Sequence, residues 1–268
     1  MHATKWLQLS IALSFLAGLF KVLGGVLGSS KSVYVDALTS IANTLSIALI
    51  YTFYRKSLEP PDHDHPFGHL RLAFGGPIAT LMLYSFVLGV VVVDIASYFG
   101  KPYTISIYAP ACAAIGMAFY ALAIATSRKE KPLTIYYARF TAIEFIEGLA
   151  TVASSLGGIL ISFWIDYVTA IALTLYLVVE LWSNLNEIVY TISDCSQMEV
   201  SSKISRYLSE LGFEVKRVRI RRVFGDAYHG DIAVKVRNPS ATNLDSFVKH
   251  VEEEIRKKFK ADVVLKVE

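Results

Sequence analysis

The sequence predicts an all-α six-helix transmembrane bundle followed by a small α+β domain at the C-terminus. Hydrophobic residues make up 54% of the 268 residues, and the mean hydropathy of +0.46 is too high for an ordinary soluble domain. Apolar residues stop dominating near residue 195, and charged residues are frequent beyond it. We therefore expect a membrane domain over residues 1–195 and a polar domain over residues 196–268.

The membrane domain contains six apolar stretches, each long enough to cross the ~30 Å hydrocarbon core of a bilayer as a helix. They cover residues 6–27, 33–54, 72–98, 106–126, 137–163 and 166–187. Helices are the simplest spanning structures because they satisfy their own backbone hydrogen bonds.

Positive residues in the loops predict the orientation of these spans. They gather before the first span, in the second loop and in the fourth loop, at Lys5, Arg55, Lys56, Arg71, Arg128, Lys129 and Lys131. The other loops offer only Lys31 and Lys101. Because positive loops stay inside, we expect a multi-pass protein of the cell membrane with both termini in the cytoplasm.

The C-terminal segment has the pattern of a helix, two strands, a helix and a strand. Residues 201–212 are amphipathic, residues 214–224 and 230–237 alternate as strands do, and residues 243–259 have helical period with Asn243 as a plausible cap. Residues 261–268 form a last predicted strand. This αββαβ order suits a small open sheet. We call residues 196–268 the tail domain.

Several classes of function find no support. No pattern pairs a nucleophile with a base, so we expect no enzyme and no organic cofactor. The basic excess of the tail is read as a solvated surface near anionic headgroups, and no nucleic-acid partner is expected. Cys112 and Cys195 stand in no zinc spacing and are interpreted as structural.

Acidic residues lie inside two of the predicted spans, where a charge costs several kcal/mol unless it faces the bundle interior or water. The second span carries Asp36, Thr39 and Asn43, and the fifth span carries Glu144, Glu147 and Thr151 at the same i, i+3, i+7 spacing. If the two stripes face each other, they form a cage of oxygen ligands for a cation. The alternative is that these carboxylates only tie helices together through hydrogen bonds.

The loop "EPPDHDHPFGH", residues 59–69, is the densest group of metal-binding side chains in the chain. Asp62, His65 and His69 are the candidate ligands, and His63 and Asp64 are further candidates. Pro and Gly between the last two histidines break a helix, which argues against a zinc-protease pair. Two interpretations remain open: a metal site, or a turn whose histidines hydrogen-bond the backbone.

These features together resemble the cation diffusion facilitator family of proton-coupled divalent-metal exporters. The resemblance covers nearly the whole chain and depends on the six spans, "VDALTSIAN", "PPDHDHPFGH" with Arg71, the acidic fifth span and the αββαβ tail. It implies a homodimer in the lipid bilayer whose tails associate, with a divalent metal cation as substrate and protons as counter-ion. It also implies a loop metal site at Asp62, His65 and His69.

The resemblance implies a transport site between spans two and five, each supplying a pair of residues four apart. The pairs fall on Thr39 with Asn43 and on Glu147 with Thr151, and Asp36 and Glu144 match an acidic position before each pair. Zinc-moving members usually have His or Asp followed by Asp, and this chain departs at all four positions. A slip of three residues in span five would instead pair Glu144 with Gly148.

Oxygen-only ligands change the expected metal, because zinc favours nitrogen and sulfur whereas manganese and magnesium accept carboxylate, amide and hydroxyl oxygens. We expect Mn²⁺ ahead of Mg²⁺ and Fe²⁺, with Zn²⁺ left open. Without a histidine at the pairs, proton exchange would fall to Glu147, Glu144 or Asp36. The rival hypothesis is a homologue that has lost transport and acts as a membrane-anchored dimeric scaffold or metal sensor.

Two further expectations follow from the resemblance. Arg71 should form an interdomain salt bridge with Asp194. The family's metal positions in the tail fall here on Arg217, Ala233, Lys266 and Glu268, a set that includes two cations and an alanine. We therefore expect a metal-free tail that serves dimerisation, with His229 and His250 as surface residues.

Overall fold

The computed structural model describes residues 5–66, 68–127, 134–224, 227–236 and 244–267. Its internal contacts divide the chain into two units. The helical unit comprises Met1–Phe53 and Gly75–Asn184, and the sheet unit comprises Tyr54–Phe74 and Leu185–Glu268. The loop basic residues Arg128, Lys129 and Lys131, the expected cap Asn243, and Glu268 lie outside the described residues.

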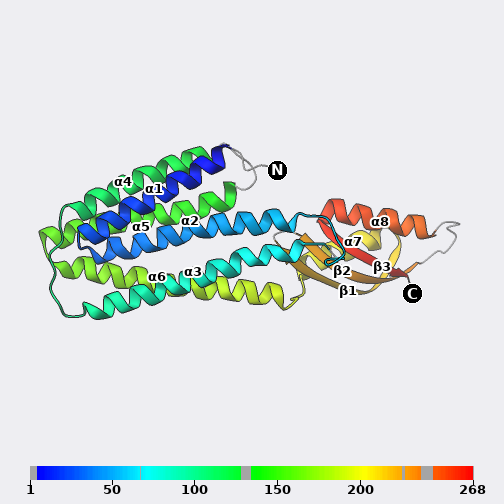
Figure 1. Ribbon diagram of the computed structural model, residues 1–268. Coiled ribbons are helices and arrows are strands. Elements are labelled where there is room, and N and C mark those ends of the chain that lie inside the picture. Colours follow the sequence, from blue (N-terminus) through cyan, green and yellow to red (C-terminus); the bar gives the residue numbers. More distant parts are fainter. Residues whose placement is uncertain (1–4, 67, 128–133, 225–226, 237–243, 268) are drawn as a thin grey trace. The chain divides into compact units, whose positions relative to one another are not determined.

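Long helices run lengthwise beside one another in the helical unit (Figure 1). They are α1 (Lys5–Leu27), α2 (Lys31–Ser57), α3 (Gly75–Ser97), α4 (Tyr108–Ser127), α5 (Thr134–Leu160) and α6 (Phe163–Ile192). Among the described residues, five helical segments are long and apolar enough to cross a membrane: Gln8–Leu27, Lys31–Ser57, Leu70–Ser97, Tyr108–Thr126 and Phe163–Ile192. A mostly helical chain with several candidate spans is therefore confirmed.

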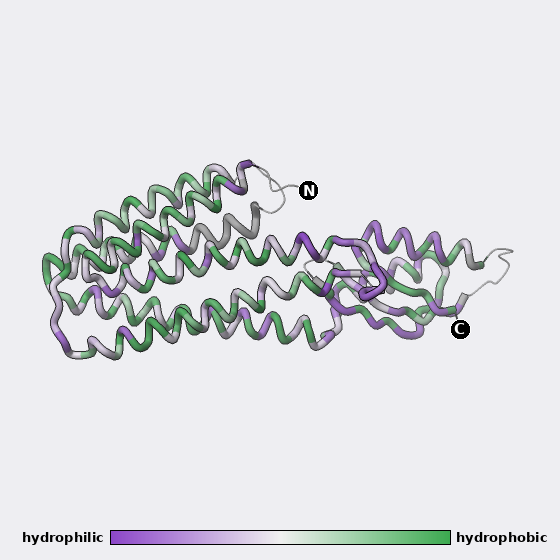
Figure 2. Tube along the Cα trace, in the orientation of Figure 1, coloured by the Kyte–Doolittle hydropathy of each residue, from purple (hydrophilic) through white to green (hydrophobic). Residues whose placement is uncertain are grey.

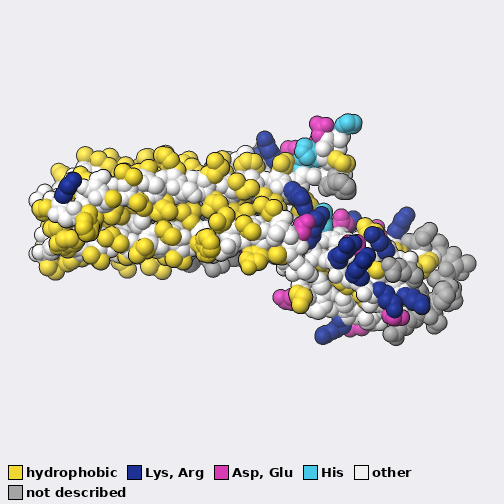
Figure 3. Space-filling model, turned by 90° about the horizontal axis from the view of Figure 1, so that it is seen from below, with side chains coloured by type: hydrophobic (Ala, Val, Ile, Leu, Met, Phe, Trp, Pro, Cys, Tyr) yellow, Lys and Arg dark blue, Asp and Glu magenta, His cyan; other side chains and the backbone are white. Residues whose placement is uncertain are grey.

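The helical unit buries small and polar side chains and exposes large apolar ones. Met82, Phe86 and Val179 are each at least 66% exposed, while Ser40, Ser155 and Thr151 are fully buried. Figure 3 shows hydrophobic side chains over the visible face of this unit, and Figure 2 shows the apolar character along its helices. An apolar surface around a polar interior is the arrangement expected of helices surrounded by lipid.

Glycines bring two neighbouring helices close to α2. A Cβ atom on Gly25 of α1 would lie 2.7 Å from Cα of Tyr34, and one on Gly76 of α3 would lie 2.7 Å from Cα of Ile50. Backbones approach this closely in membranes where small residues line the contact. Side chains that α1 and α3 direct toward α2 can therefore reach its polar stripe.

The N-terminus of α2 is held by the carboxylate of Asp166, which is fully buried in the first turn of α6. Its oxygens accept hydrogen bonds from Ser30 Oγ at 2.6 Å, Ser32 Oγ at 2.5 Å, the Lys31 backbone amide at 2.7 Å and the Tyr103 hydroxyl at 2.9 Å. A carboxylate at a helix N-terminus satisfies free amides and complements the helix dipole. Asp166 therefore fixes α2 to α6 at one end of the helical unit.

The sheet unit contains a short 3-10 helix η1 (Leu70–Phe74) and the C-terminal elements α7 (Met198–Glu210), β1 (Phe213–Phe224), β2 (Ala227–Val236), α8 (Leu244–Phe259) and β3 (Ala261–Val267). The strand order is β1-β2-β3; β1 and β2 are antiparallel, and β2 and β3 are parallel. The small C-terminal α+β part is confirmed in this form.

The core of the sheet unit lies between the sheet and its two helices. Ile204 and Leu208 of α7 and Val251 and Ile255 of α8 are all at most 1% exposed, and they pack on strand residues such as Ile232. Residues of β3 alternate between buried and exposed, as expected of a sheet covered on one face. Basic side chains gather on the face of this unit seen in Figure 3.

We predict that Asp166→Ala lowers the stability of the helical unit by about 2–4 kcal/mol, because two buried and two partly buried donors lose their acceptor. Thermal unfolding of the purified protein in detergent measures the change. Thr169→Ala is the matched control on α6, because its hydroxyl is exposed and bonds only the backbone of its own helix. Equal melting temperatures for the two variants would contradict this role.

Candidate cation site

Three acidic side chains meet in the interior of the helical unit. Asp36 of α2 and Glu144 and Glu147 of α5 each offer a carboxylate oxygen, and these oxygens all lie within 4.8 Å of one another. Ligands on opposite sides of an ion at roughly 2.2 Å would be about 4.4 Å apart. The three carboxylates can therefore share one divalent cation after a small inward shift.

Asp36 is 1% exposed and uses both of its oxygens. Oδ1 accepts a hydrogen bond from Lys21 Nζ of α1 at 2.7 Å, and Oδ2 lies 3.0 Å from the Thr151 hydroxyl of α5. Asp36 thus connects three helices. The i, i+3, i+7 stripe of α2 faces α5, as the matching stripes require.

Glu144 is 2% exposed and lies against the same face of α2. Oε2 accepts a hydrogen bond from Ser40 Oγ at 2.7 Å, and Oε1 accepts one from the Asn43 amide. The Asn43 carbonyl oxygen in turn accepts a hydrogen bond from the Tyr84 hydroxyl of α3. A hydrogen-bonded chain therefore runs from α3 through α2 to α5.

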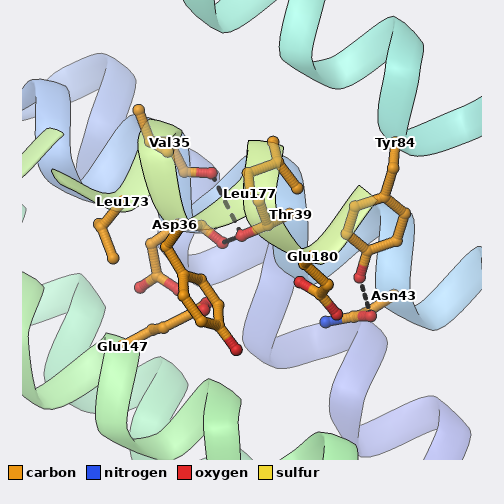
Figure 4. A pocket seen from close by; sticks show the side chains of 10 residues that line it. Val35, Asp36, Thr39, Asn43, Tyr84, Glu147, Leu173, Leu177 and Glu180 are labelled. Carbon is orange, nitrogen blue, oxygen red and sulfur yellow. Dashed lines mark hydrogen bonds between the residues drawn. The ribbon is translucent and has the colours of Figure 1, made fainter. Parts of the chain in front are cut away.

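A pocket opens beside this cluster, and Figure 4 shows the side chains that line it. Asp36 and Glu147 face its polar part, and Glu180 of α6 adds a further carboxylate. The lining is completed by Val35, Thr39, Asn43, Tyr84, Leu173, Tyr176 and Leu177. Carboxylate, amide, hydroxyl and phenol oxygens dominate the polar lining, which suits a hard cation.

The six residues of the predicted stripes have different surroundings. Asp36, Asn43, Glu144, Glu147 and Thr151 belong to the cluster or bond directly to it. Thr39 lines the pocket, but its hydroxyl lies 3.0 Å from the Asp36 backbone carbonyl of its own helix. The two acids that precede the family pairs, Asp36 and Glu144, lie at the centre of the hydrogen-bonded group.

Sequence reasoning missed four residues of this site: Lys21, Ser40, Tyr84 and Glu180. Lys21 and Glu180 fall inside predicted spans, so the rule that flagged Asp36 applies to them equally. Ser40 and Tyr84 carry no comparable signal, because hydroxyls are common in membrane helices. Only the packing reveals their contacts with Glu144 and Asn43.

A second group of possible ligands lies in the sheet unit, in the loop after α2. Asp62, His65 and His69 each offer an atom within 4.8 Å of the others. Asp62 Oδ1 lies 3.2 Å from His65 Nδ1, and Oδ2 lies 3.2 Å from His69 Nε2. A hydrogen bond from the His65 backbone amide lowers the pKa of the Asp62 carboxyl and keeps it ionised.

The orientation of His69 favours a cation at this loop. Nδ1 lies 3.1 Å from the carbonyl oxygen of Pro60, which can only accept, so Nδ1 carries the hydrogen. Nε2 then directs a lone pair toward the Asp62 carboxylate unless a proton or a metal ion lies between them. Histidine ligands of metals are commonly oriented by a backbone carbonyl in this way. The further candidates His63 and Asp64 are 103% and 85% exposed.

The same loop also forms a turn, so both interpretations of it have structural counterparts. The Gly68 amide donates to the His65 carbonyl at 2.9 Å, and Gly68 has a φ of +80°, which favours glycine. The turn and the ligand arrangement are compatible, because the turn brings His69 back beside Asp62.

Arg71 of η1 lies beside Asp194 within the sheet unit, with Nη2 at 3.3 Å from Oδ1. Arg221 of β1 contacts the other oxygen of Asp194 at 2.5 Å. One carboxylate thus connects the segment after the loop, the end of α6 and the sheet. The Arg71 and Asp194 side chains are 64% and 42% exposed.

The tail positions that correspond to a family metal site lie side by side across the sheet. Arg217 pairs with Ala233 between β1 and β2, and Ala233 pairs with Lys266 between β2 and β3. Glu268 lies outside the described residues. His250 is exposed, whereas His229 is half-buried, and its burial lowers the pKa of the imidazole.

Comparisons with known proteins agree with this architecture. The family model of the cation efflux transmembrane domain matches residues 7–193, so the chain belongs to the cation efflux family. It is 24% identical over 243 residues to the manganese efflux system protein MneS of Bacillus subtilis, covering 85% of this chain and 81% of that protein. The apolar helices and the family together define the class of this chain as a multi-pass membrane protein of the cation efflux type.

Shorter matches involve two further proteins. An uncharacterized transporter of Methanocaldococcus jannaschii is 31% identical over 97 residues, 36% of this chain and 31% of that protein. The manganese efflux system protein MneP of Bacillus subtilis is 39% identical over 49 residues, 18% of this chain and 16% of that protein.

We predict that Arg71→Ala lowers stability by less than about 1 kcal/mol, because the ion pair is exposed. Asp194→Asn should cost more, since it weakens the contacts of both arginines while asparagine tolerates the φ of +57° at this position. Thermal unfolding at low and high salt measures both variants. A larger loss for Arg71→Ala than for Asp194→Asn would contradict the shared carboxylate.

Proposed function

We propose that the protein exports a hard divalent cation, with Mn²⁺ ahead of Mg²⁺, Fe²⁺ and Zn²⁺, in exchange for protons. The observation that carries this proposal is the group of two buried carboxylates, Asp36 and Glu144, and the half-buried carboxylate of Glu147, which lie within 4.8 Å of one another inside a bundle of membrane helices. Asn43 and Thr151 extend the ligand set, and Thr39 lines its approach.

The donor chemistry and the relatives support manganese. The carboxylate, amide and hydroxyl oxygens around Asp36 and Glu144 suit Mn²⁺ or Mg²⁺ better than Zn²⁺. MneS and MneP are both named as manganese efflux proteins. Protons would exchange at the same carboxylates, because three acids in one membrane site, two of them buried, favour replacement of a bound cation by protons over a state with all three charged.

We propose the following membrane topology and dimer assembly for this exporter. Six spans would form a cation-efflux domain over residues 1–195, with both termini in the cytoplasm. The αββαβ tail, residues 196–268, would dimerise without a metal, since Arg217 and Lys266 flank Ala233 where ligands would be needed. The contact between Arg71 and Asp194 would connect the loop segment to the junction before this tail.

Glu147→Gln should abolish Mn²⁺ uptake into proteoliposomes, because it removes the charge of one ligand and one site for protons. Flux of Mn²⁺, Mg²⁺, Fe²⁺, Co²⁺ and Zn²⁺ would be measured against an imposed proton gradient. Glu187→Gln is the control, since Glu187 is exposed and its partner is Arg222. If no metal moves, or if Glu147→Gln transports normally, the export proposal is wrong.

A second function is favoured by the departures from the usual family pairs. Thr39, Asn43 and Thr151 stand where zinc-moving members usually have histidine or aspartate. A homologue without transport could act as a membrane-anchored dimeric scaffold or metal sensor. Metal-dependent association of purified full-length protein, in the absence of flux through it, would favour this second function.

We further propose that Asp62, His65 and His69 bind a peripheral metal ion. Two imidazoles and a carboxylate suit Zn²⁺ better than Mn²⁺. His69→Ala should remove one bound Zn²⁺ per chain in equilibrium dialysis, while Mn²⁺ flux persists. His63→Ala is the matched control because His63 is fully exposed. Equal Zn²⁺ binding by the two variants would contradict the metal site and leave the turn as the interpretation of this loop.

A further inference from the structure

Lys21 is a buried cation in the middle of the proposed export site. It belongs to α1, and its side chain is fully buried. Nζ lies 2.7 Å from Asp36 Oδ1, 3.0 Å from Ser40 Oγ and 3.6 Å from Glu144 Oε2. The ammonium therefore contacts two of the three carboxylates offered to a metal ion.

The neighbouring helices leave space for this lysine. A Cβ atom on Gly116 of α4 would lie 3.0 Å from Lys21 Cγ, and one on Gly148 of α5 would lie 3.7 Å from Nζ. A side chain at position 116 would crowd the stem of Lys21, whereas one at position 148 would first meet Met117, at 2.8 Å from its Cγ. The ammonium of Lys21 on α1 therefore reaches Asp36 at a place where α4 packs closely against α1 and α5.

A metal ion and this ammonium would compete for the Asp36 carboxylate. An ion bound by Asp36, Glu144 and Glu147 would lie within a few ångströms of Nζ, where two positive charges repel strongly in a low-dielectric interior. The lysine side chain is long and flexible, and the Tyr120 ring of α4 lies 4.7 Å from Nζ. The face of that ring already contacts the ammonium and can retain it when it leaves Asp36.

We propose that Lys21 competes with the transported cation for Asp36 and Glu144. This inference rests on the export function proposed above. In it Lys21 is a positioning residue, because it holds the carboxylates between transport events. It also limits how tightly the metal binds. Its return to Asp36 promotes release of the metal. This role differs from that of a fixed counter-charge, which would neutralise the site without leaving the carboxylate.

The test titrates Mn²⁺ into purified full-length protein and measures flux of the same variants in proteoliposomes. Lys21→Met keeps the length of the stem and removes the charge, so Kd for Mn²⁺ should fall by about tenfold or more. KM should fall with it, and kcat should also fall because release is slower. Lys21→Arg should raise Kd, because a guanidinium can hold a carboxylate with two hydrogen bonds.

The control is Lys31→Met, which breaks the ion pair with Asp94, at 3.0 Å, and leaves the cluster intact. Its Kd for Mn²⁺ should equal that of the unaltered protein. If Lys21→Met does not fold, the rise in Kd expected for Lys21→Arg still tests whether Lys21 competes with the metal. An unchanged Kd in Lys21→Arg, or tighter binding in Lys21→Met with undiminished kcat, indicates a fixed counter-charge and overturns the proposal.

The two proposals fail in different ways. If the unaltered protein does not bind Mn²⁺ and transports none of the five metals, but Lys21→Met binds Mn²⁺ and Lys21→Met with Asp36→Asn does not, competition is supported and export is overturned. If flux is normal but Kd does not change in either Lys21 variant, export stands and competition is overturned. If no variant binds Mn²⁺ and none of the five metals moves, both are overturned.

Discussion

The buried ion pair between Lys21 and Asp36 is the interaction on which the polar interior of the helical unit depends. Both side chains are fully buried, and the two atoms are 2.7 Å apart. Removing one member of such a pair commonly costs about 3–5 kcal/mol, because the other charge is left without compensation. Glu144 lies near the same ammonium, so one lysine offsets part of the charge of two acids.

That pair explains several features of the packing around it. Gly25 lets α1 approach α2, and Gly116 leaves space for the lysine. Ser40 accepts a hydrogen bond from Lys21 and donates one to Glu144. At the N-terminus of α2, Asp166 fixes the helix that carries Asp36. The small and polar residues of these helices therefore support the contact between Lys21 and the carboxylates of Asp36 and Glu144.

Much of this arrangement could be predicted from the sequence. The positions of the apolar helices, the small C-terminal sheet and the family follow from hydropathy and motifs. The matching stripes that contain Asp36 and Glu144 indicated that α2 and α5 face each other, and the contacts between Asn43 and Glu144 agree with that arrangement. Regular spacing was sufficient there because both stripes lie on single helices.

The partners contributed by other helices could not be predicted in the same way. Tyr84 reaches Asn43 from α3, and Glu180 lines the pocket from α6, but no spacing along the chain connects these residues to α2. Lys21 was detectable as a charge within a span, yet its sign argues against a cation site until its contact with Asp36 is seen. The identity of such partners depends on the packing of helices, which local periodicity does not determine.

The two groups of candidate ligands differ in chemistry, and this difference bears on how a substrate should be assigned. Asp62, His65 and His69 offer two nitrogens and a carboxylate at a partly exposed loop, whereas the group around Asp36 offers only oxygens and already contains an ammonium. Zinc would therefore prefer the loop even if the helical unit carries manganese. Tight zinc binding would then identify the loop, and only a response to changes at Asp36, Glu147 or Lys21 would identify the transported ion.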